Sequence, residues 1–189
     1  MHALFFEVRP LPGHLPHYFE HVARLKPELA RHNGLAFLDR YGAVGDADLL
    51  LSHQLWETEQ DIAAWRADSV HRASQAAGRH VHFADYRIRV AERVVHWQAG
   101  IAEVALPAER QDGAHVLAIY GTQPICAPGF AAFESVNHAG QFIALTTADG
   151  LASAQTVLAA QLGQPGLQQA AVYRVLRDYG MFDRAQAPR

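Results

Sequence analysis

The N-terminal part of the chain alternates short apolar runs with one amphipathic stripe, a pattern that predicts strands separated by a helix. Residues 3–9 are mostly apolar and stop at a Pro-rich turn, as a buried strand does. Large apolar residues then recur every three or four positions, the spacing of one helix face, at Leu15, Phe19, Val22, Leu25 and Leu29. Asn33-Gly34 is a favourable helix end, and residues 35–44 again predict a strand.

The stretch from Leu49 to Val90 predicts a strand, an amphipathic helix and a second strand. Its first segment is rich in leucine, and the Glu57–Glu59 segment that follows offers a helix cap and an acidic first turn. Small and apolar residues recur at helical spacing as far as Ala76, and alternation then resumes from Phe83. Residues 3–95 therefore predict the order β-α-β-β-α-β.

The C-terminal half repeats this order with one piece missing. His115–Tyr120 resembles the first strand at an offset of 113 residues, whereas Phe130 corresponds to Leu35 at an offset of 95 residues. The difference, 113 − 95 = 18 residues, is about the length of the first helix, so Gln123–Gly129 is expected to replace that helix by a loop. A strand at 142–147 and a helix at 149–161 complete the match.

The alignment of the two halves also compares individual side chains. At the same offset of 95, Ala160 stands in the second half where Trp65 stands in the first. Tyr173-Arg174 repeats Tyr86-Arg87 at an offset of 87. We interpret the shared Tyr-Arg pair as architectural and the unshared tryptophan as the better candidate for function, which predicts that activity is confined to the first half.

A set of short motifs between residues 3 and 95 carries a family resemblance: Phe6–Pro10, Pro12-Gly13, Arg24–Leu29, Asn33-Gly34, Trp56, Ala64–Arg66, His71-Arg72, Gln75, Gly78-Arg79 and Phe83–Val90. In these motifs the chain resembles the antibiotic biosynthesis monooxygenase family, whose small ferredoxin-like domains pair into dimeric α+β barrels. The fold class predicted is α+β, with tandem ferredoxin-like (βαββαβ) halves packed as a pseudo-dimeric α+β barrel and the second half lacking its first helix.

The expected domains are 1–109, similar to that family, and a degenerate ferredoxin-like domain at 114–189, joined by the linker Arg110–Gly113. In the alternative arrangement, the C-terminal half only extends the sheet of a conventional dimer. A homodimer of the whole chain is left open.

Composition narrows the classes of function. The 189 residues are 50% hydrophobic and carry a formal net charge of −3, with no run of Lys or Arg, which argues against disorder and against nucleic acid or an anionic membrane as partner. Cys126 is the one cysteine, so no intrachain disulfide forms. Neither a secretory leader nor a long apolar run is present, and a cytoplasmic location is expected.

Trp65 is the first candidate site residue. Arg72 follows it by seven positions, and on a continuous helix the two lie within about 20° of one face, where they would flank a planar ligand. In the alternative interpretation, Trp65 is a core residue and Arg72 extends to water. Some quinone-forming oxygenases of the resembled family carry a functional tryptophan at the matching helix position.

The resemblance implies a chemistry without metal, flavin or haem, in which the enolate or phenolate of the substrate supplies electrons to oxygen. A neutral histidine would accept the substrate proton and an arginine would stabilise the anion. His53 and His71 are the candidate bases, and Arg72 is the candidate anion stabiliser. Each histidine also has a structural interpretation, as a surface or hydrogen-bonded buried imidazole.

Other chemistries find less support. His80 and His82 share a strand face, and His14, His17 and His21 share a helix side, but neither set has a companion ligand at a diagnostic spacing, so a solvated surface is favoured over a metal site. Related haem-degrading proteins carry a ligating histidine ten residues after the tryptophan, where this chain has Gln75, and a first-strand Asn, where it has Phe6 or Glu7. Cys126 has no basic neighbour that would activate it.

The sequence thus predicts a cofactor-independent monooxygenase. It would act on a small aromatic, phenolic or polyketide-like substrate in the cavity of the N-terminal half, around the helix from Asp61 to Ala76. Two alternatives stay open: a non-catalytic small-ligand-binding or stress-related module, and an isomerase of small carbonyl compounds.

Overall fold

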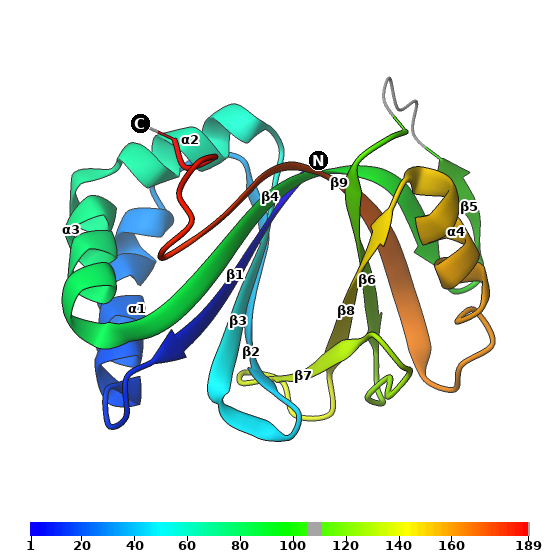
Figure 1. The fold of residues 1–189 in the computed structure, drawn as a ribbon, viewed down its shortest axis with the longest axis horizontal. Helices are drawn as coiled ribbons and strands as arrows, with labels where there is room; N and C mark the ends of the chain where they lie inside the picture. Colours follow the sequence, from blue (N-terminus) through cyan, green and yellow to red (C-terminus); the bar gives the residue numbers. More distant parts are fainter. Residues whose placement is uncertain (106–110, 189) are drawn as a thin grey trace.

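A computed structural model of the protein describes residues 1–105 and 111–188, and its centre is a closed antiparallel barrel (Figure 1). The order around the barrel is β1-β3-β2-β7-β8-β6-β9-β4, and an additional pairing of β1 with β4 closes it. The strands are β1 (His2–Pro10), β2 (Leu35–Ala43), β3 (Asp46–Trp56), β4 (Phe83–Gln98), β6 (Ala114–Gly121), β7 (Ala131–Ser135), β8 (Phe142–Asp149) and β9 (Leu167–Gly180).

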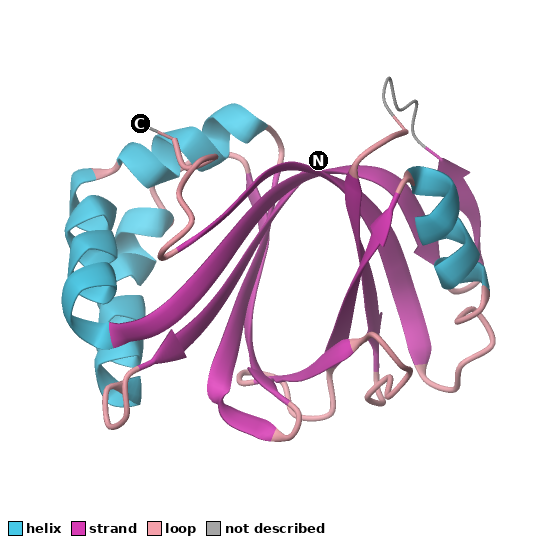
Figure 2. Cartoon of the chain, viewed as in Figure 1, coloured by secondary structure: helices cyan, strands magenta, loops and turns pink. Residues whose placement is uncertain are grey.

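Helices cover the outside of the barrel on two opposite sides, as Figure 2 shows. On one side lie α1 (Leu15–Leu29), α2 (Glu59–Ala67) and α3 (Ser69–Ala77), which a π-helical turn (Gly78–His82) joins to β4. On the other side lies α4 (Leu151–Ala159). The strand β5 (Ile101–Ala105), which the sequence did not predict, pairs with β4 outside the closed ring. Within the described residues, no helix is long and apolar enough to cross a membrane.

The predicted fold class is confirmed. The strands of the first half have the order β2-β3-β1-β4 and those of the second half have the equivalent order β7-β8-β6-β9. The halves join through β2 with β7 and β4 with β9. A loop runs from β6 to β7, where the first half has α1 between β1 and β2, so the second half lacks its first helix. The expected linker Arg110–Gly113 lies partly outside the described residues, and the domain bounds stay predictions.

The strand pairings correct the predicted correspondence between the halves. In the first half, Phe5 of β1 pairs with His53 of β3, and in the second half the equivalent Ala118 of β6 pairs with Leu145 of β8. The offset between the first strands of the halves is 113 (118 − 5), as predicted. The offset between their third strands is 92 (145 − 53), not 95. Helix α4 likewise begins 92 residues after α2 (151 − 59). The residue equivalent to Trp65 is therefore Val157, and the equivalence with Ala160 is wrong.

The predicted equivalence of the two Tyr-Arg pairs is also wrong. Tyr86 pairs with Val8, whereas Tyr173 pairs with Val116, the equivalent of Ala3. Val8 and Ala3 are five positions apart, and an odd shift turns a strand side chain to the other face of its sheet. Tyr173 accordingly packs inside the barrel, and Tyr86 packs beneath α1 and the π-helical turn.

The helix predicted from Asp61 to Ala76 is two helices. Thr58 caps the first, because its side chain accepts from the Asp61 amide while the Asp61 carboxylate accepts from the Thr58 amide, which forms a capping box. The chain then turns at Asp68, whose ψ of 133° is not helical, and the Asp68 carboxylate accepts from the His71 amide to begin α3. One aspartate thus ends one helix and caps the next.

The close approach of β6 to the loop before β9 gives a test of the barrel packing. A Cβ at Gly121 would overlap the carbonyl oxygen of Gly166 and lie 3.1 Å from its carbonyl carbon, whereas a Cβ at Gly163 meets nothing within 4 Å. Gly121→Ala should lower the free energy of unfolding by about 1–3 kcal/mol in urea titration, because the strand must shift. Gly163→Ala is the matched control, and equal stability of the two variants would contradict this packing.

Candidate functional site

A cavity of about 1040 Å³ lies between the outer face of the first-half sheet and helices α1, α2 and α3. Its volume suits a small organic ligand. The apolar stripe of α1 forms one wall with Val22, Leu25 and Leu29, and β1 and β4 supply Leu4, Phe6, Ile88 and Val90 to the floor. Polar and charged side chains enter this apolar space from the three helices, the π-helical turn, β2, β3 and the C-terminal segment.

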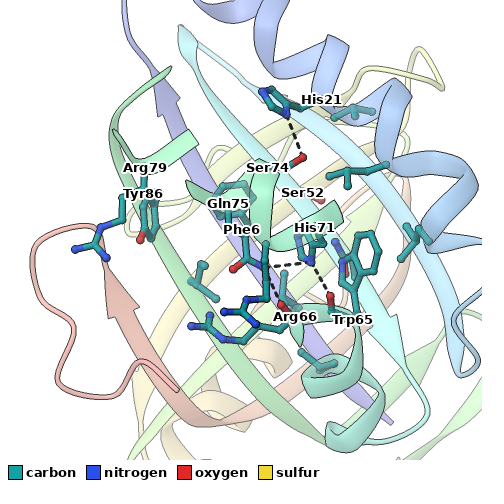
Figure 3. Close-up of a pocket in the computed structure, with 18 of the residues that line it drawn as sticks. Phe6, His21, Ser52, Trp65, Arg66, His71, Ser74, Gln75, Arg79 and Tyr86 are labelled. Carbon is teal, nitrogen blue, oxygen red and sulfur yellow. Dashed lines mark hydrogen bonds between the residues drawn. The ribbon is translucent and has the colours of Figure 1, made fainter. Parts of the chain in front are cut away.

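Trp65 and His71 meet at one end of the cavity (Figure 3). Their rings are stacked, with centroids 4.0 Å apart and an interplanar angle of 14°. His71 Nδ1 lies 2.8 Å from the Trp65 carbonyl oxygen. Trp65 is 3% exposed and also packs in a core cluster with Trp56, Ile62 and Val90, so it is at once a core residue and a cavity wall.

The environment of His71 fixes both its charge and its tautomer. Burial lowers the pKa of His71 from 6.5 to about 4, so the ring is neutral at pH 7. A carbonyl oxygen only accepts, which places the ring proton on Nδ1 and leaves Nε2 as the nitrogen that can accept a proton. The Gln75 amide nitrogen also approaches Nδ1, at 3.2 Å, but the shorter carbonyl contact decides the tautomer.

The strand β3 divides its polar side chains between two compartments. Ser52 and Gln54 face the cavity, where they are 4% and 8% exposed. The Gln54 oxygen accepts from Trp56 Nε1 at 2.9 Å. Both side chains lie where a ligand in the cavity can reach them.

His53, between these two residues, points the other way. It is fully buried inside the barrel, stacks on Phe5 at 4.6 Å and has its Nε2 2.8 Å from the Tyr120 hydroxyl. Burial lowers its pKa from 6.5 to about 3. The expectation that His53 is a base beside the helix is wrong, because alternation along the strand turns it away from the cavity.

Arg72 lies at the cavity surface, but not as predicted. The turn at Asp68 interrupts the helix, so the seven-residue spacing no longer aligns Arg72 with Trp65. His71, one position before Arg72, stacks on the Trp65 ring instead, and the Arg72 side chain is exposed. Arg72 can therefore act on a ligand at the cavity mouth, not against the indole.

The charged side chains that line the cavity are basic, with no acidic partners in the described lining. Seven cationic side chains line it and no Asp or Glu among the described residues does, although the chain as a whole has a formal net charge of −3. The cationic residues are Lys26, Arg40, Arg66, Arg72, Arg79, Arg177 and Arg184. A cavity lined by one sign of charge and by apolar walls raises the local concentration of ligands of the opposite sign.

The C-terminal segment covers part of the cavity, where Tyr179, Arg184 and Pro188 contribute to the lining. Arg66 holds this segment, because its guanidinium donates to the Tyr179 hydroxyl at 3.0 Å and to the Pro188 carbonyl at 3.1 Å. Arg184 donates to the Tyr86 hydroxyl at 2.7 Å. Substrate entry at this edge therefore depends on residues far from Trp65 in the sequence.

The histidines weighed as metal ligands show a different arrangement. Nδ1 of His14 lies 3.0 Å from Nδ1 of His82, a hydrogen-bond contact, and His21 contacts Ser74 at 3.1 Å. In the described part of the chain, no group of three or more His, Cys, Asp or Glu is arranged to hold a metal ion. Cys126 is exposed.

Comparison with known proteins finds a family model that matches part of the first half. The sequence model of the antibiotic biosynthesis monooxygenase family matches residues 1–77. This segment contains β1 to β3, α2 and the Trp65–His71 pair. The resemblance predicted from the sequence is confirmed.

Other known proteins are similar to this chain over most of its length. A jasmonate monooxygenase from Pyricularia oryzae is 26% identical over 216 residues, covering 100% of this chain and 97% of the relative. An aldoxime dehydratase structure has a TM-score of 0.56 at 7% identity, covering 92% of this chain and 80% of that one, and shares the fold. An anthrone oxidase-like protein has a TM-score of 0.43 at 13% identity, covering 100% and 96%.

Several cavity residues were missed from the sequence. Ser52 and Gln54 interrupt a leucine-rich strand at alternate positions, and that spacing was a usable signal for polar groups on one face. Arg40 follows the same rule on β2. Arg177, Tyr179 and Arg184 gave no local signal, because only the course of the C-terminal segment brings them to the cavity.

The lowered pKa of the buried His53 predicts acid sensitivity. Between pH 6.5 and about 3, His53 is protonated in the unfolded state but neutral in the folded state. The free energy of unfolding therefore falls as the pH falls through this window. At pH 5 the loss from His53 alone is about 2 kcal/mol, using 1.36 kcal/mol per pH unit. Urea titrations from pH 7.5 to 4.5 should show a shallower slope for His53→Gln, which does not titrate.

The exposed His138 supplies the control for that titration. His138→Gln removes one exposed imidazole and is compared with His53→Gln at the same pH values. Identical slopes for wild type and His53→Gln would show that His53 is not buried in the neutral form.

Proposed function

We propose that the chain is a monooxygenase that oxidises a small, weakly acidic organic substrate bound beside Trp65 and His71. The observation that carries the proposal is the neutral His71 ring, stacked on Trp65 with its proton fixed on Nδ1 and Nε2 free to accept. The match of residues 1–77 to the antibiotic biosynthesis monooxygenase family model and the full-length alignment with a jasmonate monooxygenase support the same reaction class.

The chemistry starts with a proton transfer. His71 Nε2 takes a proton from an acidic C–H or phenolic O–H group of the substrate, and the positive side chains around the cavity stabilise the resulting anion. The apolar walls exclude water and strengthen these interactions. The substrate anion then gives one electron to molecular oxygen, and the two radicals combine into a hydroperoxide that takes back the proton from His71.

The overall conversion balances without an added reductant. An acidic methylene group of the substrate and one molecule of oxygen form a hydroperoxide. Loss of one water molecule, which breaks the remaining C–H bond and the O–O bond at that carbon, then leaves a carbonyl group. The substrate supplies all the electrons, in keeping with the cofactor-independent members that the sequence resembles. The protein supplies the base, the positive potential and a dry cavity, and the stacked indole holds the imidazole in place against the substrate.

Oxygen uptake with a panel of phenols, 1,3-diketones, anthrones and jasmonate tests the proposal. Wild type should consume oxygen with at least one compound, and His71→Gln should reduce kcat/KM by about 10²–10⁴, the contribution of a positioned base. Trp65→Phe should give a smaller loss through the misplaced imidazole. Trp97→Phe is the matched control, because Trp97 packs against the core of the second half. Uptake by none of the proteins, or equal uptake by all, removes the proposal and favours a binding module.

The pH dependence of the reaction gives a second test. The free enzyme should keep a constant kcat/KM from pH 8 down to about 5.5 and lose activity below, as His71 is protonated with a pKa of about 4. This acidic limb should be absent in the residual activity of His71→Gln. A limb centred near 6.5 in wild type would contradict the assignment of His71 as the base.

A further inference from the structure

The cavity-lining cations differ from the other cations of the chain in what they bind. Outside the cavity, five of the seven cationic residues in the described part of the chain pair with a carboxylate: Arg9, Arg31, Arg87, Arg89 and Arg174. Among the seven that line the cavity, Arg177 alone does, through Glu59. The cavity therefore holds positive charge that no described carboxylate neutralises.

Arg40 differs from Arg177, the other cavity-lining cation with a buried Nε, because Arg177 pairs with Glu59 and Arg40 has no carboxylate partner among the described residues. Arg40 lies on β2 and faces the cavity, and its Nε is buried without a hydrogen-bond partner in the described residues. Its sequence neighbour Asp39 cannot serve as counterion. Asp39 accepts from the Ser135 hydroxyl and the Asn137 amide, each at 2.7 Å. A half-buried guanidinium without a counterion is costly to the free protein.

Two further polar groups surround Arg40. Ser52 pairs with it directly across the sheet, and its hydroxyl faces the cavity. The Tyr18 side chain from α1, which is 6% exposed, also lines the cavity. Burial raises the pKa of Tyr18, and the nearby charge of Arg40 opposes that rise. Arg40, Ser52 and Tyr18 thus present hydrogen-bond donors to one part of an otherwise apolar floor.

The sheet register places this group relative to the proposed reaction centre. Arg40 and Ser52 belong to one cross-strand row, and Leu38 and Gln54 belong to the next row toward Trp65. Trp65 packs with Leu4 and Leu38 of that second row. Two residues along a strand span roughly 7 Å, which is the separation along the sheet between the Arg40 row and the row beneath Trp65.

We propose that the substrate of this cavity is an apolar organic acid, whose carboxylate binds the guanidinium of Arg40 and accepts from Ser52. Its apolar body lies along the floor, and its reacting carbon reaches Trp65, which packs over the next cross-strand row, and His71 stacked on it. A planar guanidinium matches a carboxylate with two parallel hydrogen bonds, which a neutral ligand does not exploit. The inference rests on the proposed function for the reaction, but binding can be measured without turnover.

The test compares acids with their neutral amides by isothermal titration calorimetry. The probes are 1-naphthylacetate with 1-naphthylacetamide, and octanoate with octanamide. Wild type should bind each acid at least ~10-fold more tightly than its amide, the size of a charge-assisted hydrogen bond. Arg40→Gln should abolish the preference for the acid over the amide. Arg40→Lys should keep part of this preference, because lysine keeps the positive charge but cannot make the two parallel hydrogen bonds of a guanidinium.

The control and a stability measurement separate binding from folding. Arg31→Gln removes the same charge from an exposed ion pair beside the end of α1 and should keep the wild-type preference. The melting temperature of ligand-free Arg40→Gln should equal or exceed that of wild type, because an unpaired buried charge is removed. A lower melting temperature for Arg40→Gln would point to a structural role and overturn the inference.

The remaining outcomes also decide the matter. Equal affinity for acid and amide, no binding of either acid at millimolar concentration, or an unchanged preference in Arg40→Gln overturns the inference. Arg40-dependent acid binding without oxygen uptake would remove the proposed oxygenase and leave the anion site. Oxygen uptake with neutral phenols that Arg40→Gln does not change would keep the oxygenase and remove the anion site.

Discussion

The closure of one antiparallel sheet into a barrel is the constraint on which the rest of the structure depends. Once β4 pairs with both β1 and β9, every strand has one face toward the barrel interior and one toward the helices. Adjacent residues of a strand then lie on opposite faces of the sheet. His53 becomes a neutral, buried part of the interior, while Ser52 and Gln54 on either side of it become the polar floor of the cavity. The same alternation separates Asp39 from Arg40.

The second determinant is local. Asp68 breaks the helix between Trp65 and His71 and caps the helix that follows. Without this turn, Arg72 would share a face with Trp65. With it, the imidazole stacks on the indole and donates to the carbonyl of the same tryptophan. A single capping residue thus selects which nitrogen can accept a proton. The stack forms within the α2–α3 segment, and the packing of Trp65 with Trp56 and Val90 fixes that segment on the sheet.

The two halves share their strand order but differ in what covers the outer face. Three helices span the first sheet and leave a large cavity. In the second half, α4 packs directly on its sheet, with Ala154 and Leu158 buried against strand residues such as Leu117 and Val172. The loss of one helix and the replacement of Trp65 by Val157 leave this half with a filled core. An asymmetric pseudo-dimer can thus carry one site, while the second half completes the barrel and supplies the C-terminal segment that covers it.

The sequence by itself determined the order of most elements, the tandem organisation and the missing helix, and it identified Trp65 and His71 as candidate site residues. Hydrophobic periodicity and caps are local, so they can be found without the fold. The β5 strand was not predicted, and the offsets between the halves were wrong for Ala160 and for the Tyr-Arg pair. Periodicity shows where a strand runs, but only hydrogen-bonded register shows which residues are opposite and which face they take.

Only the tertiary structure decided which candidates meet. It removed His53 from the cavity, moved Arg72 to its mouth, and brought Arg40 of β2 together with Arg177 and Arg184 of the C-terminal segment in one apolar space. Burial and the pairing of charges depend on neighbours far apart in the chain. For this reason the unneutralised positive charge of the cavity is invisible in a sequence whose formal net charge is −3.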